Sequence, residues 1–301
     1  MPSPIHLIPS SGVVREHPEL DPHPGPVVVC DCYVEGIEHG TAVPGGYERG
    51  RVVNVDHHAD TPRMRRRVSS ANLAIERVRA CGVAPDGTTV VVNHTDCDSI
   101  LSAGIIAGRL EPDGDYGDAA LAADHTGAEH PIADLLQALD PARDVELSFR
   151  SLDALRRGRP LEAAVEAALD DRRRRRQAAA DAVASGRMRM DGPIAWGVFD
   201  ETLQGEFFPA LLPEAVVILA MAPHRELPPG RLEMKLRLGA RAPEGFSLHG
   251  LLAGFDPGFG GRWNAGANKR PRDDRPGGSD VAPERYAAEL RRRVEERLSA
   301  R

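Results

Sequence analysis

The feature that most constrains what this chain can fold into is a short β-branched run that stops on an acid and two histidines. Residues 51–55 read Arg-Val-Val-Asn-Val, and Asp56, His57 and His58 follow directly. A short apolar run rich in valine predicts a buried strand. The three polar residues are therefore expected at the carboxyl edge of a sheet, where open α/β sheets bind ligands. Carboxylate oxygen and imidazole nitrogen are ligands that divalent transition metals favour.

The same pattern occurs four times in the first half of the chain. The residues that end the other three runs are Asp31 after 26–30, His94, Asp96 and Asp98 after 88–93, and Asp124 and His125 after 119–123, the most helical of the four. Carboxylates gathered this densely repel one another and stay ionised only where cations lie between them. The spacing of His94, Asp96 and Asp98 has the period of a strand, so an extended chain would point all three to one side. The recurrence predicts a metal site at the edge of a parallel sheet.

Taken singly, each motif has a plainer interpretation. Asp31 alone would be a turn residue, and Asp124 with His125 alone would be a helix cap. The segment from His94 to Asp98 alone would be a turn rich in bonds from side chains to the backbone. The metal interpretation rests on finding all of these motifs in one alternating α/β pattern.

These motifs resemble those of the DHH phosphoesterase superfamily. The superfamily includes RecJ-type exonucleases, nanoRNases, cyclic dinucleotide phosphodiesterases and manganese-dependent inorganic pyrophosphatases. Residues 53–58 resemble its name-giving motif, residues 68–78 resemble the helix start that follows it, and residues 94–99 resemble its Asp-x-Asp motif. In the family the Asp-x-Asp motif normally comes before the single Asp and the Asp-His-His. Here it comes after them, so the resemblance implies a member with permuted motif order.

The resemblance implies a two-metal phosphohydrolase. The implied ligands are Asp31 as the bridge between two ions, His94 and Asp96 on one ion, and His57, Asp98 and Asp124 on the other. The implied catalytic residues are His58, which would contact phosphoryl oxygens, and Asp56, which is either a ligand or an acid that orients one. The mixed nitrogen and carboxylate set suits Mn²⁺, with Mg²⁺, Co²⁺ or Fe²⁺ as the alternatives.

The second half of the chain carries a related resemblance. Residues 258–270 resemble the glycine-rich signature of the DHH-associated C-terminal domain, although its histidine is absent and Arg262 and Trp263 stand around that position. The resemblance implies that this segment binds the substrate phosphate. The implied contacts are Arg262, Asn264, Asn268, Lys269 and Arg270. His125 would be a further phosphate contact or a bystander.

Length and patterning predict two domains and a helical connection. The predicted parts of the 301 residues are a metal-binding α/β domain over 1–142, with a parallel sheet and helices on both faces, a helical linker over 143–190, and a smaller α/β substrate-binding domain over 191–301 that ends in a helix. Strands of the smaller domain are expected at 194–199, 215–221 and 232–238, the last alternating like an exposed strand. Five successive arginines at 172–176 predict a solvated helix face, with a phosphate- or nucleic-acid-binding face as the alternative.

Composition limits the partners. The net charge of −7 and an aromatic content of 4% disfavour tight binding of long nucleic acid, which needs a basic surface and stacking platforms. No apolar segment is long enough to span a bilayer, and no signal peptide is evident. We therefore expect a cytoplasmic protein with no membrane partner and with its four cysteines reduced. Dimers occur in the family, which leaves a homodimer open.

The sequence thus predicts a metal-dependent enzyme that cleaves a phosphoester or phosphoanhydride in a small phosphorylated molecule or nucleotide. Two alternatives stay open. One is a nuclease or phosphodiesterase acting on short oligoribonucleotides or cyclic dinucleotides, against which the acidic charge and the missing histidine weigh. The other is a metal-containing ligand sensor without turnover, against which the presence of every expected ligand type weighs.

Overall fold

The computed structural model describes residues 2–9, 12–16, 19–271 and 276–300. The chain forms two compact units. Unit 1 contains residues 1–124 and 129–172, and unit 2 contains residues 125–128 and 173–301. The helix α6 (Ala163–Ala184) belongs to unit 1 in its first part and to unit 2 in its second part. The predicted linker, 143–190, contains this point of division.

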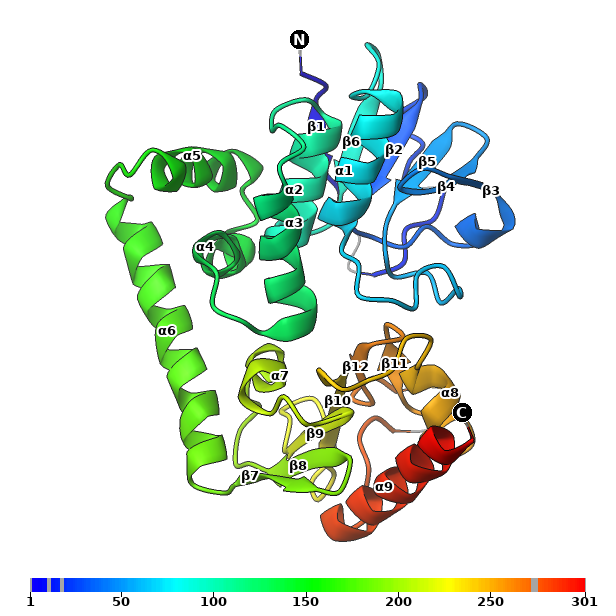
Figure 1. Cartoon of the computed structure of the whole chain (residues 1–301), viewed down its shortest axis with the longest axis vertical. Helices are drawn as coiled ribbons and strands as arrows, with labels where there is room; N and C mark the ends of the chain where they lie inside the picture. Colours follow the sequence, from blue (N-terminus) through cyan, green and yellow to red (C-terminus); the bar gives the residue numbers. More distant parts are fainter. Residues whose placement is uncertain (1, 10–11, 17–18, 272–275, 301) are drawn as a thin grey trace. The chain divides into compact units, whose positions relative to one another are not determined.

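Unit 1 is built on a six-stranded sheet (Figure 1). In spatial order its strands are β1 (Ile5–Leu7), β6 (Thr89–Val92), β2 (Val27–Cys30), β5 (Val52–Val55), β4 (Gly46–Arg49) and β3 (Thr41–Val43). The first four run parallel, and β4 and β3 form an antiparallel hairpin beside β5. The strands predicted at 26–30, 51–55 and 88–93 are confirmed as β2, β5 and β6.

The order of the strands puts β2 in the middle of the three. β6 follows β5 along the chain, yet it pairs with the opposite side of β2. Val27 is level with Val52 of β5 and with Thr89 of β6, so the three strands end close to one level. The residues that follow them therefore emerge side by side at one edge of the sheet, although their order in the chain is different.

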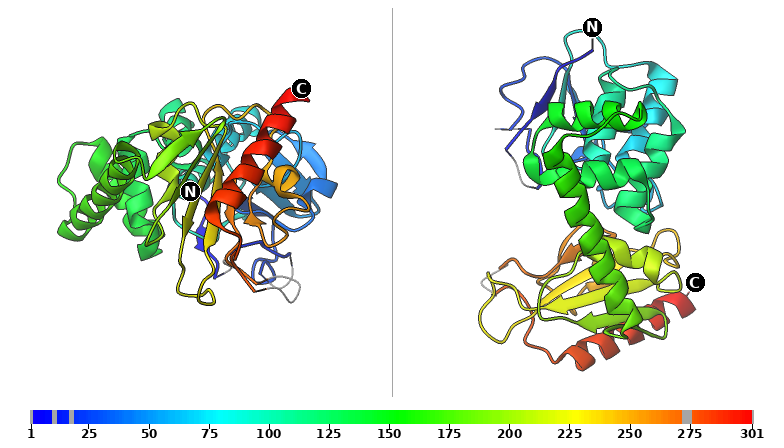
Figure 2. Two further views of the ribbon diagram at one scale, coloured as in Figure 1. Left: turned by 90° about the horizontal axis from the view of Figure 1, so that it is seen from below. Right: turned by 90° about the vertical axis from the view of Figure 1, so that its left-hand side faces the viewer.

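The central strand β2 is followed by the 3₁₀ turn η1 (Ile37–His39) and the β3–β4 hairpin, and the other helices of unit 1 follow β5 and β6. They are α1 (Ser70–Cys81), α2 (Cys97–Ile106), α3 (Gly114–Leu121), the π-helix η2 (Ala122–Thr126), α4 (Pro131–Leu139), the 3₁₀ turn η3 (Asp140–Ala142) and α5 (Val145–Arg156). Helices α1 and α2 pack on each other and on the strands, as the right-hand view in Figure 2 also shows. The strand expected at 119–123 is wrong. This alanine-rich segment is helical, because alanine is the strongest helix former.

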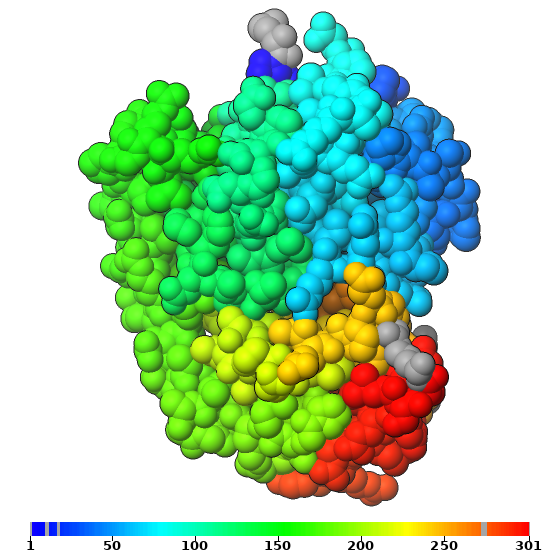
Figure 3. Space-filling view, viewed as in Figure 1, coloured from blue at the N-terminus to red at the C-terminus, as the bar shows by residue number. Residues whose placement is uncertain are grey.

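Unit 2 is built on a second six-stranded sheet. In spatial order its strands are β11 (Gly260–Gly261), β12 (Ala265–Ala267), β10 (Glu233–Leu238), β9 (Val217–Ala222), β8 (Ile194–Val198) and β7 (Met188–Asp191). The short helices η4 (Gly205–Phe207), α7 (Phe208–Leu211) and α8 (Leu248–Leu252) and the long helix α9 (Pro283–Ser299) complete it. The outer face of α9, red in Figure 3, is open to solvent. The α/β fold class with two sheets is confirmed.

The strands predicted for unit 2 are confirmed as β8, β9 and β10, but the exposed character expected of β10 is wrong. β10 pairs with β9 on one side and β12 on the other. Met234 and Leu236 pack into a core with Trp263 and the α9 residue Leu290. On the other face of β10, Glu233 is buried, while Lys235 and Arg237 are half-buried.

The arginine run on α6 is solvated only in its middle. Arg173, Arg174 and Arg175 are exposed. Arg172 is buried, and its Nε donates to Asp134 Oδ1 at 2.8 Å. Arg176, one helical turn later, donates to the Gly127 carbonyl oxygen at 2.8 Å. The two ends of the run therefore anchor the helix, because positions four apart share a helix face. None of the helices formed by the described residues is long and apolar enough to cross a membrane.

Candidate metal centre

Asp31 follows the middle strand β2 and lies at the centre of the polar edge. Its side chain is fully buried, and its backbone φ of 53° falls in the left-handed region. Aspartate tolerates that conformation better than most residues, and a residue held there at a cost often marks a functional site. The Ser70 and Ser99 hydroxyls donate to its Oδ1 and Oδ2 at 2.9 and 2.8 Å. The carboxylate is thus fixed in one orientation.

Two groups of ligand atoms meet at this edge. The first is Asp31, His57, His58 and Asp124, and the second is Asp31, His94 and Asp96. Within each group the offered atoms lie within 4.8 Å of one another, and Asp31 belongs to both. Its shared position follows from the sheet, because β2 lies between β5 and β6.

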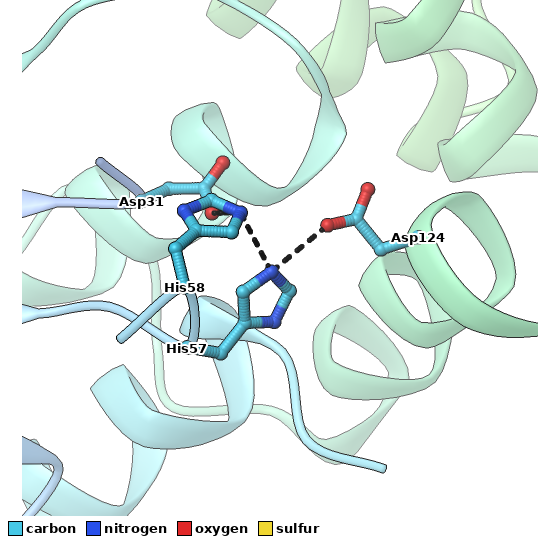
Figure 4. A group of neighbouring side chains, drawn as sticks. All are labelled: Asp31, His57, His58 and Asp124. Atoms are coloured by element: carbon cyan, nitrogen blue, oxygen red, sulfur yellow. Dashed lines mark hydrogen bonds and ion pairs between the residues drawn. The ribbon is translucent and has the colours of Figure 1, made fainter. Parts of the chain in front are cut away.

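The first group is shown in Figure 4. His57 Nε2 lies 3.2 Å from Asp124 Oδ2 and 2.9 Å from His58 Nε2. His58 Nε2 lies 3.9 Å from Asp31 Oδ1. Asp124 comes from the π-helix η2, and the other three residues follow strands. A helix and two strand ends therefore bring two imidazoles and two carboxylates to one point.

The second group uses the other oxygen of Asp31. His94 Nε2 lies 3.1 Å from Asp31 Oδ2 and 3.4 Å from Asp96 Oδ2. Asp96 is also the N-cap of α2, because its Oδ1 accepts the backbone N–H of Ser99 at 3.0 Å. One carboxylate oxygen thus caps a helix while the other faces the imidazole.

The hydrogen bonds of the three histidines leave the same nitrogen directed at the carboxylates. Nδ1 of His57 donates to the Val68 carbonyl oxygen at 2.7 Å, Nδ1 of His58 lies 2.6 Å from Asp56 Oδ1, and Nδ1 of His94 bonds to Asn93 Oδ1. Those oxygens only accept, so in the neutral rings the proton is on Nδ1 and Nε2 carries a lone pair. Metal-binding histidines are held by their second nitrogen in this way.

The donor set fits a divalent transition metal. Lone pairs on Nε2 and negative carboxylate oxygens at these distances repel one another unless a proton or a cation lies between them. Three imidazole nitrogens with the carboxylates of Asp31, Asp96 and Asp124 form the mixed nitrogen and oxygen set that manganese, iron, cobalt and zinc accept. The residues present therefore match the predicted metal chemistry.

Without a metal, protons take that place. Burial disfavours the charged form of His57, but the hydrogen bond to Asp124 and the charge of Asp98 outweigh it and raise the pKa of His57 to about 10. Burial likewise opposes charging of His94, and Asp96 and Asp31 outweigh it and raise the pKa of His94 well above its usual value. A bound cation would have to displace these protons.

Two acids of the predicted set lie outside both groups. Asp56 contacts both the ring and the backbone of His58, since its Oδ1 lies beside Nδ1 and its Oδ2 accepts the His58 backbone N–H at 3.0 Å. Asp98 accepts the backbone N–H groups of Ser70 and Ala71 at 2.7 and 2.6 Å, at the start of α1. The reason is that the chain turns into α2 at Cys97, so the strand period no longer applies at Asp98 and its side chain does not join those of His94 and Asp96. Burial and the charge of Asp31 raise the pKa of Asp98 well above its usual value.

The predicted phosphate-binding residues belong to unit 2, and the structure divides them by environment. Asn268 is buried and used by the fold, because its Oδ1 accepts the Met234 N–H at 2.9 Å and its Nδ2 donates to Asp256 at 2.9 Å. Asn264 is also buried. The cations remain accessible to solvent, with Arg262 and Lys269 half-buried and Arg270 exposed. His125 packs near Trp263, with ring centroids 6.2 Å apart.

One cation of unit 2 was missed by the sequence analysis. Lys235 lies on the interior strand β10 and is half-buried. Burial lowers the pKa of Lys235, and Arg237 and Lys269 add to that effect against the opposing charge of Glu233. Three cations therefore lie close enough to repel one another, which an anion would relieve. The sequence signal for this residue is that Lys235 and Arg237 lie two positions apart in a predicted strand and therefore on the same face.

The cysteines play no visible part in the centre. All four are free thiols; Cys30, Cys32 and Cys97 are buried, and Cys81 is exposed. Burial raises the pKa of the Cys32 thiol well above its usual value, so it stays protonated and packs as a small apolar residue.

Comparisons with known proteins do not assign a family to the chain. No protein-family model matches the chain, and no curated protein matches it. Among solved structures, PggH, a pGpG-specific phosphodiesterase from Vibrio cholerae, is similar with a TM-score of 0.44 and 10% sequence identity, over 73% of this chain and 88% of that one. A TM-score this low does not establish a shared fold.

Proposed function

We propose that this protein is a metal-dependent phosphohydrolase that cleaves a phosphoester or phosphoanhydride in a small phosphorylated molecule or nucleotide. The observation that supports the proposal is the convergence of three imidazole Nε2 atoms on carboxylates, with Asp31 common to two groups. The resemblance of the sequence motifs to DHH phosphoesterases, in permuted order, points the same way. The Asp-x-Asp motif follows β6, which pairs with β2, so the permuted motif still lies beside Asp31.

The ligands we propose are those that the geometry brings together, apart from His58, to which we assign a role toward the substrate. The residues that would hold two ions are His94 and Asp96 for one, His57 and Asp124 for the other, and Asp31 for both. When bound, Mn²⁺ or a related cation would activate water and neutralise phosphoryl charge. Asp98 would act by holding the start of α1, and Ser70 on that helix start holds Asp31.

His58 and Asp56 would act on the substrate. The Asp56 carboxylate beside Nδ1 fixes the direction of the His58 ring, whose Nε2 donates only when both ring nitrogens carry protons. Nε2 of His58 would then donate to a phosphoryl oxygen, where negative charge develops during cleavage. In unit 2, Lys235, Lys269 and Arg262 would bind phosphate oxygens, since ammonium and guanidinium groups are strong donors to phosphate.

The test is a hydrolysis assay on chelator-treated protein to which Mn²⁺ is returned. The substrate panel contains pyrophosphate, a phosphomonoester, a nucleoside bisphosphate, a linear dinucleotide and a cyclic dinucleotide, and products are separated by chromatography. Mn²⁺-dependent turnover of one class supports the proposal and names the bond. Turnover confined to the dinucleotides would favour the phosphodiesterase alternative. Protein that binds Mn²⁺ and turns over no member would favour the sensor, and protein that binds no divalent cation would overturn the metal centre.

Two variants separate the roles of the paired histidines. His57→Ala should lose Mn²⁺ affinity, because it removes an Nε2 that faces Asp124 at 3.2 Å. His58→Ala should keep most of that affinity and lose turnover, by about 10²–10³-fold for loss of one donor to the developing charge. If both variants lose Mn²⁺ equally, His58 is a ligand and its substrate role is wrong.

A further inference from the structure

The loop that carries His94 and Asp96 leaves the sheet before it reaches either residue. β6 ends at Val92, and α2 begins at Cys97. Thr95, between the two proposed ligands, is fully buried. A buried backbone group without a hydrogen-bond partner destabilises the fold. The loop therefore needs partners from outside the sheet.

The turn η3, which follows α4, supplies the first partner. Asp140 Oδ1 accepts the backbone N–H of Thr95 at 2.9 Å. In return the Thr95 hydroxyl donates to the Asp140 carbonyl oxygen at 3.1 Å. These two bonds join the middle of the loop to one residue that lies 45 positions later in the chain.

Arg143 supplies the second partner. Its Nη2 donates to the carbonyl oxygen of Asn93 at 3.0 Å and to that of Ile8 at 3.3 Å. Arg143 has a φ of 51°, and among the described residues only it and Asp31 combine a side chain with a positive φ. That conformation is unfavourable for a residue with a side chain and persists where the surroundings impose it. Both strained residues thus serve the same polar edge, one directly and one through Asn93.

The side chain of Asn93 carries this support to the imidazole. Its Nδ2 donates to the Gly12 carbonyl oxygen at 2.9 Å, and its Oδ1 bonds to His94 Nδ1. The backbone of Asn93 is held by Arg143. The direction of the His94 ring is therefore set by residues that do not themselves face the carboxylates.

We infer that Asp140 and Arg143 form a clamp, here called the η3 clamp, that positions His94 and Asp96 to bind a cation. The inference rests on the proposed metal centre and assigns positioning residues to it. The segment 124–143 has Asp124 of the first ligand group at one end and the clamp on the second group at the other, joined by α4. One segment therefore serves both groups, and the clamp acts through hydrogen bonds to Thr95 and Asn93.

The experiment measures metal binding rather than activity. Chelator-treated protein is titrated with Co²⁺ by calorimetry and followed by the visible absorption of the bound ion. Asp140→Ala removes the acceptor for Thr95, and we expect affinity for one of two ions to fall by about 10–100-fold. Asp140→Asn keeps an oxygen acceptor and should stay within about threefold of the parent. Rescue by the amide distinguishes hydrogen bonding from the charge of Asp140, which also acts on Asp96.

A matched control and a second variant keep the test decisive. Asp144→Ala removes another carboxylate that accepts a backbone N–H, that of Leu147 at 2.9 Å, and should leave Co²⁺ affinity unchanged. Arg143→Gly keeps a backbone that tolerates positive φ and loses the guanidinium, so it should weaken binding even if Asp140→Ala does not fold.

The outcomes separate this inference from the proposed function. Parent-like affinity in Asp140→Ala and Arg143→Gly overturns the clamp, and so does equal weakening in Asp140→Ala and Asp140→Asn. A parent protein that binds Co²⁺ but hydrolyses nothing overturns the proposed function and leaves the clamp to be judged by these affinities. A parent protein that binds no divalent cation overturns both.

Discussion

In the sheet of unit 1, β6, β2 and β5 run parallel and end side by side, whereas in unit 2 the candidate phosphate-binding residues lie in the turn of the antiparallel β11–β12 hairpin, directly after β12 and on β10. Parallel strands gather whatever follows them at one edge, so Asp31, His57 and His94 meet there. Where the chain leaves the antiparallel strand β12, adjacent residues have different environments. Asn268 bonds within the fold, while its neighbour Lys269 stays accessible.

The largest loss of metal binding is expected when Asp31 is changed. This variant tests whether Asp31 is shared by both ligand groups. Asp31→Asn keeps the size and the tolerance of positive φ but loses the charge. We expect Mn²⁺ affinity and hydrolysis both to fall by more than about 100-fold, because both ligand groups use this carboxylate. Calorimetric titration and product release would measure this. Two ions bound with parent affinity would contradict the shared position.

Asp98 tests whether all acids at this edge have the same role. Asp98→Ala should lower the free energy of unfolding of the metal-free protein by about 2–4 kcal/mol, because it leaves the N–H groups of Ser70 and Ala71 buried without an acceptor. Asp113→Ala is the matched control, since Asp113 caps the start of α3 at a partly exposed position and should cost only about 1 kcal/mol. Urea denaturation measures both.

The contrary result for Asp98 would be equally informative. If Asp98→Ala is no less stable than Asp113→Ala but loses Mn²⁺, then Asp98 is a ligand, as the family resemblance implies. The ligand set would then be larger than the two groups that the geometry brings together.

The pH dependence of Mn²⁺ binding tests whether a cation replaces the proton of His57 in unit 1. Because the pKa of His57 is raised to about 10 in the metal-free protein, its ring holds a proton at neutral pH and must release it to bind a cation through Nε2. Mn²⁺ affinity should therefore rise by about tenfold per pH unit from about pH 7 to pH 9. Calorimetry in buffers of different ionisation enthalpy counts the protons released. Affinity that does not change with pH would contradict the proton-for-cation exchange.

The smallest effects on stability and on substrate binding are expected in unit 2. One pair of variants there distinguishes a residue that stabilises the fold from a residue that binds substrate. Asn268→Ala should lower the free energy of unfolding by about 1–3 kcal/mol, because Met234 N–H and Asp256 each lose a buried partner. Lys235→Met should leave stability unchanged or raise it, and should raise the KM for a phosphate substrate by about tenfold. If Lys235→Met leaves KM unchanged, the cations of β10 do not bind substrate.

Sequence patterns predicted the parts of the centre that depend on parallel strands. The valine-rich runs before Asp31 and Asp56 have one plausible structure, and the ends of parallel strands meet without further information. Alternation failed where the chain changed structure. Asp98 lies in the first turn of α2, where the strand period does not apply, and residues 119–123 form a helix where the pattern of strand ends predicts a strand.

The remaining features depend on long-range contacts that no local pattern records. Asp140 meets Thr95 across 45 residues, and Asn54 holds Val29 and Cys32 across more than 20. In unit 2 the interior position of β10 depends on its pairing with β12, whose glycine-rich sequence resembles a loop. This pairing brings Asn268 against Met234 of β10, where it is buried, and no local pattern shows that position.

The π-helix η2 sets a condition on the length of the chain. A π turn holds one residue more than an α turn, and η2 carries Asp124 toward His57. Deleting a single residue from 121–123 would convert the segment to a regular α-helix and rotate Asp124 by about 100°, away from the imidazole. An insertion or deletion within 121–124 should therefore disturb the first ligand group. The exposed turn at 157–160 between α5 and α6 can change in length and leave the ligand groups intact.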